Sequence, residues 1–431
     1  MKTHPAGRKL FAHAFGCQMS AADVAEMSGA LAKRGFALTS ELDEADAVLV
    51  GTCTVRDHAE HRALSYIGRL REWKTSHPEG AIIVAGCAAE RIGGGELKRR
   101  FPHVDLVAGS KSVESFPSIV DSFLSKRAPA EPKTSPAVSA SGISATLTIM
   151  RGCDAACSYC IVPSVRGPES HRPAGEILGE ARLKAEAGAR EFTLLGQAVN
   201  GWHGAFEGRP AGFGDLLGLV ASVPGVERVR FMSPHPLRFD ETVARAMAEH
   251  PKVVPALHLP AQSGSDRILA LMRRGYDRAS YLATVAMARR LLPGLTVTTD
   301  ILLGFPTETE ADFADSLSLL SEMGAVSAFC FKYSPRQGTP SSLLCDDVPR
   351  EVKEERLVLL HALVAELSAA YLDSLVGREV SVLVDEPGTG RAADGFRVRL
   401  DEPVLPGRVV SAVVSGRAGN ILMAHIPRRK A

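Results

Sequence analysis

The sequence has no excess of charge of either sign. Among 431 residues, 50 Lys+Arg stand against 49 Asp+Glu, which leaves a formal net charge of +1. This balance excludes a globally basic nucleic-acid coat and an acidic disordered chain. A local basic patch remains compatible with it.

The sequence also has no apolar run as long as a membrane helix, and its first residues, MKTHPAGRKL, contain no signal-peptide core. We therefore expect a cytoplasmic protein with no membrane partner. At roughly 150 residues per domain, the length predicts about three domains. A chain of this size buries enough apolar surface to fold without disulfide bonds.

Eight cysteines are present. In a cytoplasmic chain of this length they indicate metal binding or catalysis more often than disulfides. Six of them fall into two sets of three, namely Cys153, Cys157 and Cys160, and Cys17, Cys53 and Cys87. Cys330 lies in an apolar stretch and Cys345 in a polar one, and we expect no chemical role for either.

The hydrophobic pattern predicts an α/β protein. Up to residue 125, buried strands alternate with amphipathic helices, which predicts a parallel α/β domain with strands at 10–14, 47–50, 81–85 and 104–107. Residues 126–142 are rich in proline and small polar residues, which indicates an extended linker.

The alternation resumes over residues 143–375, with predicted strands at 145–149, 191–196, 227–232, 256–259, 295–303 and 327–332. This pattern predicts a full or partial (β/α) barrel with its chemistry at the C-terminal ends of the strands. A long helix is expected over 349–375. Short alternating strands then predict a small β-barrel in 376–431, with strands at 379–384, 395–400, 408–414 and 420–426.

Cys153, Cys157 and Cys160 form a CxxxCxxC loop, RGCDAACSYC, directly after the predicted strand 145–149. Three thiolates at this spacing suit a cubane cluster in which one iron has no protein ligand. Zinc is the alternative, but a structural zinc site needs four ligands and usually CxxC pairs. Three buried core thiols are disfavoured because the intervening residues are polar.

Cys17, Cys53 and Cys87 each follow a predicted parallel strand. Ligand sites in such sheets gather at the C-terminal strand ends, so the three cysteines can converge on a second cluster with one open iron. Taken singly, each could be a buried structural thiol. The same placement three times favours the cluster.

With these motifs the chain resembles the radical S-adenosylmethionine methylthiotransferases over almost its whole length. The tRNA-modifying branch is most similar in several stretches, which are FGCQMS, RDHAEHRALSYIGRL, CSYCIVPSVRGPESHRP, LLGQAVNGW, HLPAQSGSDRILALMRRGY, DILLGFPTET and FKYSPRQGTP. The sequence departs from the family at Ser20 and Gly51, where asparagine is common, and at Glu90, where glutamine is common.

The resemblance implies two 4Fe-4S clusters and S-adenosyl-L-methionine as cofactors. Cys153, Cys157 and Cys160 would hold the cluster that cleaves the cofactor to a 5′-deoxyadenosyl radical, and Cys17, Cys53 and Cys87 the cluster for sulfur transfer. Residues after predicted strands are the expected cofactor contacts, namely Gln197, Asn200, Ser233, Gln262, Ser263 and Gly304. Arg166 and Arg172 are expected to contact RNA or to close the site.

The implied reaction is methylthiolation of C2 of N6-isopentenyladenosine at position 37 of tRNA, with two S-adenosylmethionine molecules per product. The partners would be prenylated tRNA and an electron donor such as flavodoxin or ferredoxin, and the chain would be a monomer. Residues 376–431 hold nine Arg/Lys and six Asp/Glu, a local excess that suits RNA. The alternatives are an aspartate of a ribosomal protein or N6-threonylcarbamoyladenosine as substrate, and a metal-stabilised RNA-binding scaffold without catalysis.

Overall fold

The computed structural model describes residues 8–126 and 142–427. Contacts divide the chain into two compact units. Of the described residues, the first unit contains residues 8–126 together with Arg151–Asp154 and Cys160–Glu169, and the second contains the remainder. Nearly all of the predicted linker and the last residues of the basic tail lie outside the described residues.

The first unit is built on a parallel sheet in the order β2-β1-β3-β4-β5. Its strands are β1 (Arg8–Ala14), β2 (Phe36–Thr39), β3 (Ala47–Thr52), β4 (Ala81–Gly86) and β5 (Leu106–Gly109). The four strands predicted here are confirmed. The edge strand β2 was not predicted, because it is short and pairs with β1 alone, leaving Leu38 49% exposed.

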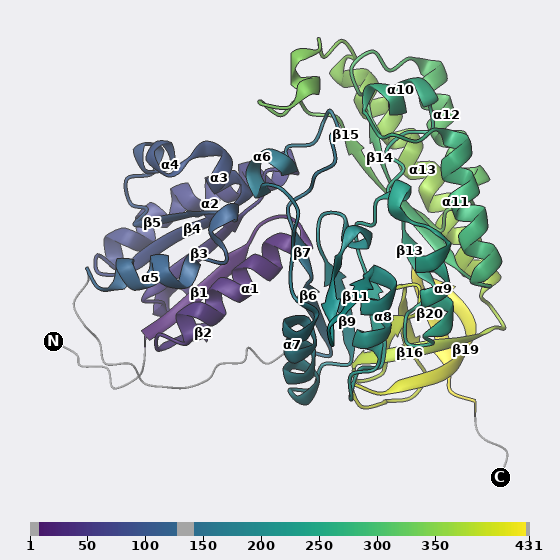
Figure 1. Cartoon of the computed structure of the whole chain (residues 1–431), viewed down its shortest axis with the longest axis horizontal. Coiled ribbons are helices and arrows are strands. Elements are labelled where there is room, and N and C mark those ends of the chain that lie inside the picture. The colour runs from purple at the N-terminus through teal and green to yellow at the C-terminus, as the bar shows by residue number, and fades with distance from the viewer. Residues whose placement is uncertain (1–7, 127–141, 428–431) are drawn as a thin grey trace. The chain divides into compact units, whose positions relative to one another are not determined.

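Helices cover both faces of this sheet (Figure 1). They are α1 (Gln18–Ala32), α2 (Asp57–Ser76), α3 (Cys87–Ile92), α4 (Gly94–Arg100) and α5 (Phe116–Leu124). Strand residues alternate between two cores, with Leu49 packed beside α1 and α5 and Val48 and Val50 beside α2 and α4. The apolar runs read from the sequence are therefore buried on both faces, as parallel sheets require.

The second unit contains six parallel strands in two sheets, ordered β12-β9-β6 and β13-β14-β15. The strands are β6 (Ser144–Thr148), β9 (Glu191–Leu195), β12 (Arg228–Phe231), β13 (Ala256–His258), β14 (Thr296–Leu303) and β15 (Ser327–Lys332). A parallel bridge from Val229 to Val253 links the first sheet to the segment that leads into β13. The predicted partial barrel is thereby confirmed.

The helices of this unit are α7 (Ala174–Glu186), α8 (Phe213–Ala221), α9 (Glu241–Glu249), α10 (Asp266–Leu271), α11 (Arg278–Leu291), α12 (Glu310–Glu322) and α13 (Arg350–Ser374). A hairpin of β10 (His203–Phe206) and β11 (Arg209–Gly212) was not predicted. Its residues are mostly exposed, so it lacks the apolar alternation that marks a core strand.

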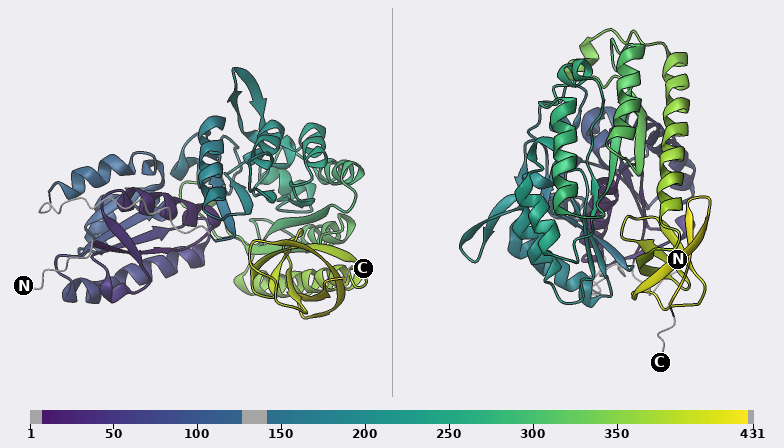
Figure 2. Two further views of the ribbon diagram at one scale, coloured as in Figure 1. Left: turned by 90° about the horizontal axis from the view of Figure 1, so that it is seen from below. Right: turned by 90° about the vertical axis from the view of Figure 1, so that its right-hand side faces the viewer.

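Five short strands close the C-terminal barrel in the order β16-β17-β18-β20-β19 (Figure 2). They are β16 (Glu379–Glu386), β17 (Thr389–Ala392), β18 (Arg397–Leu400), β19 (Val409–Ala418) and β20 (Ile421–His425). The predicted barrel is confirmed, with β17 as an additional strand. Arg228 of β12 anchors it by donating hydrogen bonds to the carbonyl oxygens of Arg391 and Ser381, at 2.7 and 2.6 Å.

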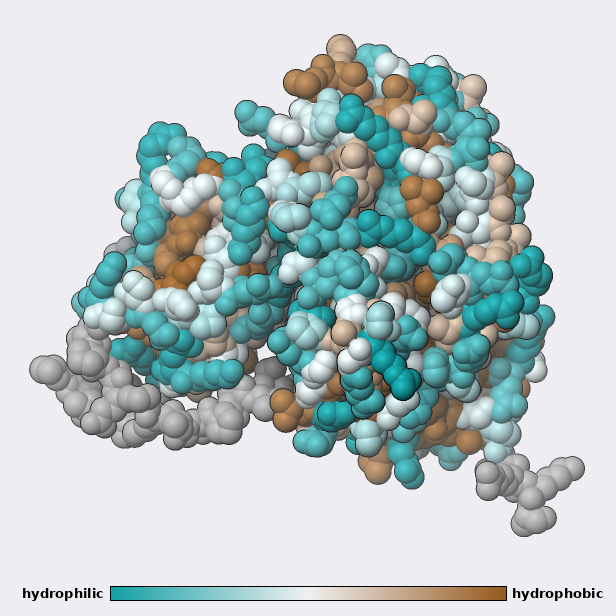
Figure 3. All heavy atoms as spheres, in the orientation of Figure 1, coloured by the Kyte–Doolittle hydropathy of each residue, from teal (hydrophilic) through white to brown (hydrophobic). Residues whose placement is uncertain are grey.

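Helix α13 differs from the expectation that the chain contains no apolar run as long as a membrane helix. It contains a window long and apolar enough, by composition alone, to cross a membrane. The same helix contributes Leu360 to the core of the partial barrel and Leu372 to the core of the C-terminal barrel. Only 17% of that apolar window is buried, and Figure 3 shows the apolar residues of the visible face in separate patches among hydrophilic ones.

Candidate functional site

The first three-cysteine set lies at one edge of the sheet in the first unit. Cys17 precedes α1, Cys53 follows β3, and Cys87 begins α3 directly after β4. Because β1, β3 and β4 are neighbours in the sheet, their C-terminal ends bring the three thiols to the same edge. The predicted placement is confirmed for all three.

The sulfur atoms of this set interact with one another. A hydrogen bond between Cys17 and Cys53 lowers the pKa of Cys53 to about 6 and raises the pKa of Cys17. Burial raises the pKa of Cys87, and the cation of Arg166 opposes that increase. Cys53 and Cys87 are buried, while Cys17 is partly exposed. The set therefore combines two buried thiols and one partly exposed thiol that influence one another's ionisation.

Glycines allow the backbone to approach this set closely. Gly16 has φ +123°, and a Cβ at that position would overlap the side chain of Cys53. Gly86 has φ +103°, and a Cβ there would overlap the backbone of Thr52. Both conformations are accessible to glycine at little cost. The two glycines next to Cys17 and Cys87 thus make room for the cysteines.

The second set occupies the loop between β7 (Met150–Arg151) and α6 (Val162–Arg166). Gly152 has φ +77°, and a Cβ there would overlap the Pro168 carbonyl, so the loop must turn at glycine. The Cys153 amide donates a hydrogen bond to the Gly167 carbonyl at 3.2 Å. Cys153 and Cys160 are grouped with the first compact unit, whereas Cys157 is grouped with the second.

Cys157 has a cationic partner that the sequence did not reveal. Arg274 Nη1 lies 3.2 Å from Cys157 Sγ and 3.3 Å from Tyr159 Oη. Its Nε donates to Tyr276 Oη at 2.9 Å, and its Nη2 to the Pro260 carbonyl at 3.1 Å. Arg274 is only 5% exposed. It stands in one of the stretches quoted for the family resemblance, but nothing in its local sequence indicated contact with a cysteine.

Three of the expected cofactor residues lie at the C-terminal strand ends and have features of a ligand site. Gln197 follows β9, and its Oε1 is buried without a hydrogen-bond partner among the described residues. Ser233 follows β12 with φ +62°, and Gln262 follows β13 with φ +75°. Such a backbone costs about 1–3 kcal/mol for a residue other than glycine and gathers at functional sites.

The other three expected contacts are engaged by the protein itself. The Asn200 amide donates to the His235 carbonyl at 2.9 Å and accepts from the His235 amide at 2.8 Å. Ser263 is buried and accepts a hydrogen bond from the Ser265 amide at 3.2 Å. The Gly304 amide donates to a carboxylate oxygen of Glu308 at 2.6 Å. Within the described structure these residues hold the strand-end loops in place.

Arg166 is buried and Arg172 is partly exposed, and both have acidic partners. Arg172 Nη1 donates to the Thr148 carbonyl and to Glu180, both at 2.7 Å. The side chain of Arg166 is 4% exposed and pairs with Asp23 at 2.7 Å. Arg166 is thus engaged by an acidic partner inside the first unit, whereas Arg172 stays partly exposed, and the expected contact with RNA or closure of the site stays a prediction for both. Cys330 lies in β15 and Cys345 in an exposed loop before α13, away from both three-cysteine sets in the chain.

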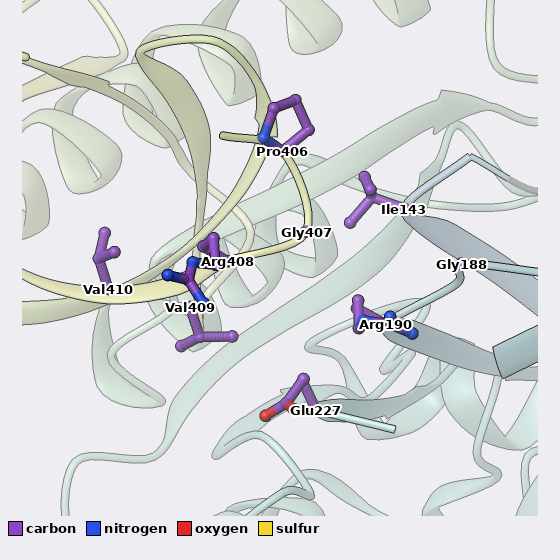
Figure 4. Close-up of a pocket in the computed structure, with 9 residues that line it drawn as sticks. All are labelled: Ile143, Gly188, Arg190, Glu227, Pro406, Gly407, Arg408, Val409 and Val410. Atoms are coloured by element: carbon purple, nitrogen blue, oxygen red, sulfur yellow. The ribbon is translucent and has the colours of Figure 1, made fainter. Parts of the chain in front are cut away.

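A cavity of about 810 Å³ opens elsewhere in the second unit. Figure 4 shows Ile143, Arg190 and Glu227 on one side of it and the segment Pro406–Val410 on the other. The first three residues directly precede β6, β9 and β12. The cavity therefore lies at the N-terminal ends of these strands, opposite the ends that carry Gln197 and Ser233. In such barrels the N-terminal face usually serves stability rather than chemistry.

Within residues 8–126 and 142–427, no group of three His, Cys, Asp or Glu side chains is arranged to hold a single metal ion. In a cubane each thiolate binds a different iron, so the sulfurs need not converge on one point. The chemistry of the donor sets, three thiols each, fits iron–sulfur clusters, and the buried, unpartnered Oε1 of Gln197 fits a polar ligand.

Two family models match the chain, one over each segment that contains a three-cysteine set. The model described as "Uncharacterized protein family UPF0004" matches residues 9–109, which contain Cys17, Cys53 and Cys87. The model of the "Radical SAM superfamily" matches residues 147–320, which contain the CxxxCxxC loop. The chain is a radical S-adenosylmethionine methylthiotransferase. Members of this family bind two 4Fe-4S clusters and S-adenosylmethionine, and each matched range contains one of the two cysteine sets.

Solved structures support the fold of this methylthiotransferase. The radical S-adenosylmethionine methyltransferase TsrM from Kitasatospora setae, with cobalamin and a [4Fe-4S] cluster bound, aligns with a TM-score of 0.58 and 14% identity, over 78% of this chain and 77% of that chain. The same enzyme with tryptophan substrate and aza-SAM bound gives a TM-score of 0.57 and 13% identity, over 78% and 75%. At this identity the likeness concerns the fold alone.

Two of the departures from the family lie close to the first cysteine set. Ser20 is buried and donates a hydrogen bond to the Phe15 carbonyl at 3.1 Å. At Gly51 a Cβ would overlap the side chain of Val24, so the asparagine common in the family would require Val24 to move. The departures thus alter packing behind the cysteines and leave all six thiols in place.

Proposed function

We propose that this methylthiotransferase acts on tRNA and methylthiolates C2 of N6-isopentenyladenosine at position 37, next to the anticodon, with two S-adenosylmethionine molecules per product. The observation that carries the substrate class is the closed C-terminal β-barrel that follows the catalytic domain. Small β-barrels of this kind bind nucleic acids through loops and one face of the sheet. The stretches that resemble the tRNA branch favour the same substrate.

Charge on the barrel supports this proposal. Arg378, Arg399 and Arg408 are exposed, and none forms an ion pair within the described part of the chain. By contrast, Arg397 pairs with Asp385 at 2.9 Å, and Arg417 with Asp373 at 2.6 Å. Exposed arginines without an acidic partner suit the phosphates of an RNA backbone.

The roles of the catalytic residues follow from their positions. A cluster on Cys153, Cys157 and Cys160 supplies the reductive cleavage of S-adenosylmethionine, and Cys17, Cys53 and Cys87 hold the cluster used in sulfur transfer. We assign cofactor contacts to Gln197, Ser233 and Gln262, and to Asn200, Ser263 and Gly304 the positioning of the loops that carry those contacts.

The wider assignments belong to the same proposal. We infer a cytoplasmic monomer that takes electrons from a small donor such as flavodoxin or ferredoxin. We also divide the chain into the methylthiotransferase domain at 1–125, the linker at 126–142, the radical domain at 143–375 and the RNA-binding barrel at 376–431.

The test is nucleoside analysis of tRNA from a deletion strain. We expect the methylthio group to be absent and the prenyl group to remain. Complementation with the parent chain restores the modified nucleoside, whereas Cys153→Ala and Cys17→Ala do not. Unchanged methylthio content in the deletion strain contradicts the proposal. Loss of the methylthio group from N6-threonylcarbamoyladenosine, or loss of a modified aspartate from a ribosomal protein, identifies one of the other two substrates.

A second measurement separates an enzyme from a scaffold that uses metal only for stability. Anaerobic reconstitution of two 4Fe-4S clusters predicts about eight irons per chain, together with 5′-deoxyadenosine when S-adenosylmethionine and a reductant are added. A scaffold predicts about four metal ions at most and no cleavage product. The Cys153→Ala variant is the matched control, because it lowers the iron content and abolishes cleavage.

A further inference from the structure

A buried cluster of charged side chains lies in the first unit near Cys17 and Cys87. Asp23 of α1 is 3% exposed at its side chain and pairs with two arginines, Arg151 and Arg166. The side chains of these arginines are 9% and 4% exposed. The second acid of the network, Glu26, pairs with Arg151 at 2.6 Å and is 48% exposed.

The buried part of this network has more positive than negative charge. Arg151 and Arg166 share the buried carboxylate of Asp23. The carboxylate of Glu26 is half exposed to solvent, so it is not counted among the buried charges. An uncompensated charge away from water is strongly unfavourable, so a buried cation requires an anion nearby. Arg166 shows this need directly, because its Nη1 is buried and has no hydrogen-bond partner among the described residues.

Packing places Arg166 beside the first cysteine set. It ends the short helix α6, in which Val165 packs in one apolar cluster with Ile161 and Cys87. The Ser110 hydroxyl donates to the Val165 carbonyl at 2.6 Å, and Ser110 also hydrogen-bonds Cys87. Helix α6 is thereby attached to the segment that carries Cys87.

Electrostatics agrees with this placement. Burial alone would lower the pKa of Arg166, but attraction to Asp23, Cys87 and Cys17 raises it, so the guanidinium is a permanent cation. A doubly positive cubane core on three thiolates is an anion overall, and it becomes more negative on reduction. It supplies the negative charge that the buried network lacks.

We propose that Arg166 is a positioning residue for the cluster on Cys17, Cys53 and Cys87, acting as a fixed cation that favours the reduced state of that cluster. Its Nη1 has no hydrogen-bond partner among the described residues and is therefore available to an anionic cluster, while its Nη2 donates to Asp23 at 2.7 Å. Asp23 partly cancels the cation. The two residues therefore move the reduction potential in opposite directions. The inference depends on the cluster that the family binds and not on the identity of the substrate.

The experiment isolates this cluster in the full-length chain. Replacing Cys153, Cys157 and Cys160 together with alanine removes the other cluster, so an EPR-monitored redox titration reports on the remaining one. In this background Arg166→Gln is expected to disfavour reduction by about tenfold or more, which is about 59 mV more negative for one electron. Arg166→Lys keeps the charge and stays within about threefold of the parent.

Asp23→Asn distinguishes an electrostatic role of Arg166 from a structural one. Removing the negative charge of Asp23 is expected to raise the reduction potential, whereas Arg166→Gln is expected to lower it. If the ion pair were only structural, the two variants would not shift the reduction potential in opposite directions. An unchanged potential in Arg166→Gln with full iron content overturns the proposal, as do shifts of the same sign in both variants. If Arg166→Gln fails to retain iron, Asp23→Asn decides, and a potential at or below that of the parent overturns the proposal.

Discussion

Arg274 offers a sharp test of how the protein controls the cluster on the CxxxCxxC loop. It is buried and donates four hydrogen bonds, to Cys157, Tyr159, Tyr276 and the Pro260 carbonyl. Arg274→Met keeps most of the apolar volume and removes all four bonds. Arg274→Lys keeps the charge but cannot reproduce the planar set of donors.

The magnitude follows from the lost bonds. A hydrogen bond to or from a charged group contributes about 1.5–3 kcal/mol, and an acceptor left without a partner adds a desolvation cost, so Arg274→Met should lower the free energy of unfolding by about 3–5 kcal/mol. Loss of the bond to Cys157 also removes positive charge beside the cluster. If the interaction of Arg274 with the reduced cluster is about 1.4 kcal/mol more favourable than with the oxidised cluster, its loss lowers the reduction potential by about 59 mV.

Both effects are measurable on one background. With Cys17, Cys53 and Cys87 replaced by alanine, the cluster on the loop is the one that an EPR-monitored titration reports. Urea denaturation gives the stability of the same sample, and 5′-deoxyadenosine formation gives its cleavage rate. We expect Arg274→Lys to lie between the parent and Arg274→Met in all three. A parent-like potential in Arg274→Met at full iron content would refute this reasoning.

Three further changes have defined outcomes. Gly16→Ala should abolish assembly of one cluster, because the added Cβ overlaps Cys53, and roughly half of the iron should remain. Arg228→Met should destabilise the C-terminal barrel by about 1–3 kcal/mol, seen as faster hydrogen exchange in β16. Burial alone would raise the pKa of Asp312, but hydrogen bonds from Arg267 and other donors lower it well below its usual range. Asp312→Asn should therefore cost about 2 kcal/mol in urea at pH 7 and less as the pH falls below about 4.

Matched controls sharpen these outcomes. Gly29→Ala adds a methyl group in helix α1 where nothing lies within 4 Å, so it should keep all iron and raise stability by up to about 1 kcal/mol. Arg399→Met removes an exposed barrel arginine and should leave exchange in β16 unchanged. A full iron content in Gly16→Ala, parent-like exchange in Arg228→Met, or a stability loss in Asp312→Asn that is independent of pH would each contradict the corresponding prediction.

The sign of the Asp312 effect comes from linkage. A carboxyl group whose pKa is lowered on folding binds protons less readily in the folded state than in the unfolded chain. Its contribution is fully present above the unfolded pKa of about 4 and is lost as the pH falls through the folded value. The asparagine variant has no such proton, so its disadvantage relative to the parent shrinks in acid.

Local patterns predicted much of this molecule. Buried parallel strands such as β3 and β4 were visible because both faces are covered, so every residue is apolar or small. The cysteines were identified because each follows such a strand or forms a compact spacing of its own. Strands β2 and β17 and the β10–β11 hairpin were missed, since short or exposed strands leave little hydrophobic signal.

Side-chain partnerships could not be predicted in this way. The local sequences around Arg166 and Arg274 contain no signal for their partners. Arg166 pairs with Asp23, and Arg274 lies within hydrogen-bond distance of Cys157, and both partners are far away in the chain. Asn200 shows the converse. Its position after a strand suggested a ligand contact, yet its amide is engaged by the backbone of His235.

The sequence by itself predicted which thiols carry the chemistry and determined which strands they follow, because spacing and hydrophobic period are properties of neighbouring residues. Only the tertiary structure decided which charges face those thiols. A guanidinium reaches its partner through the folding of separate segments, and its effect depends on burial, which exists only once those segments have packed.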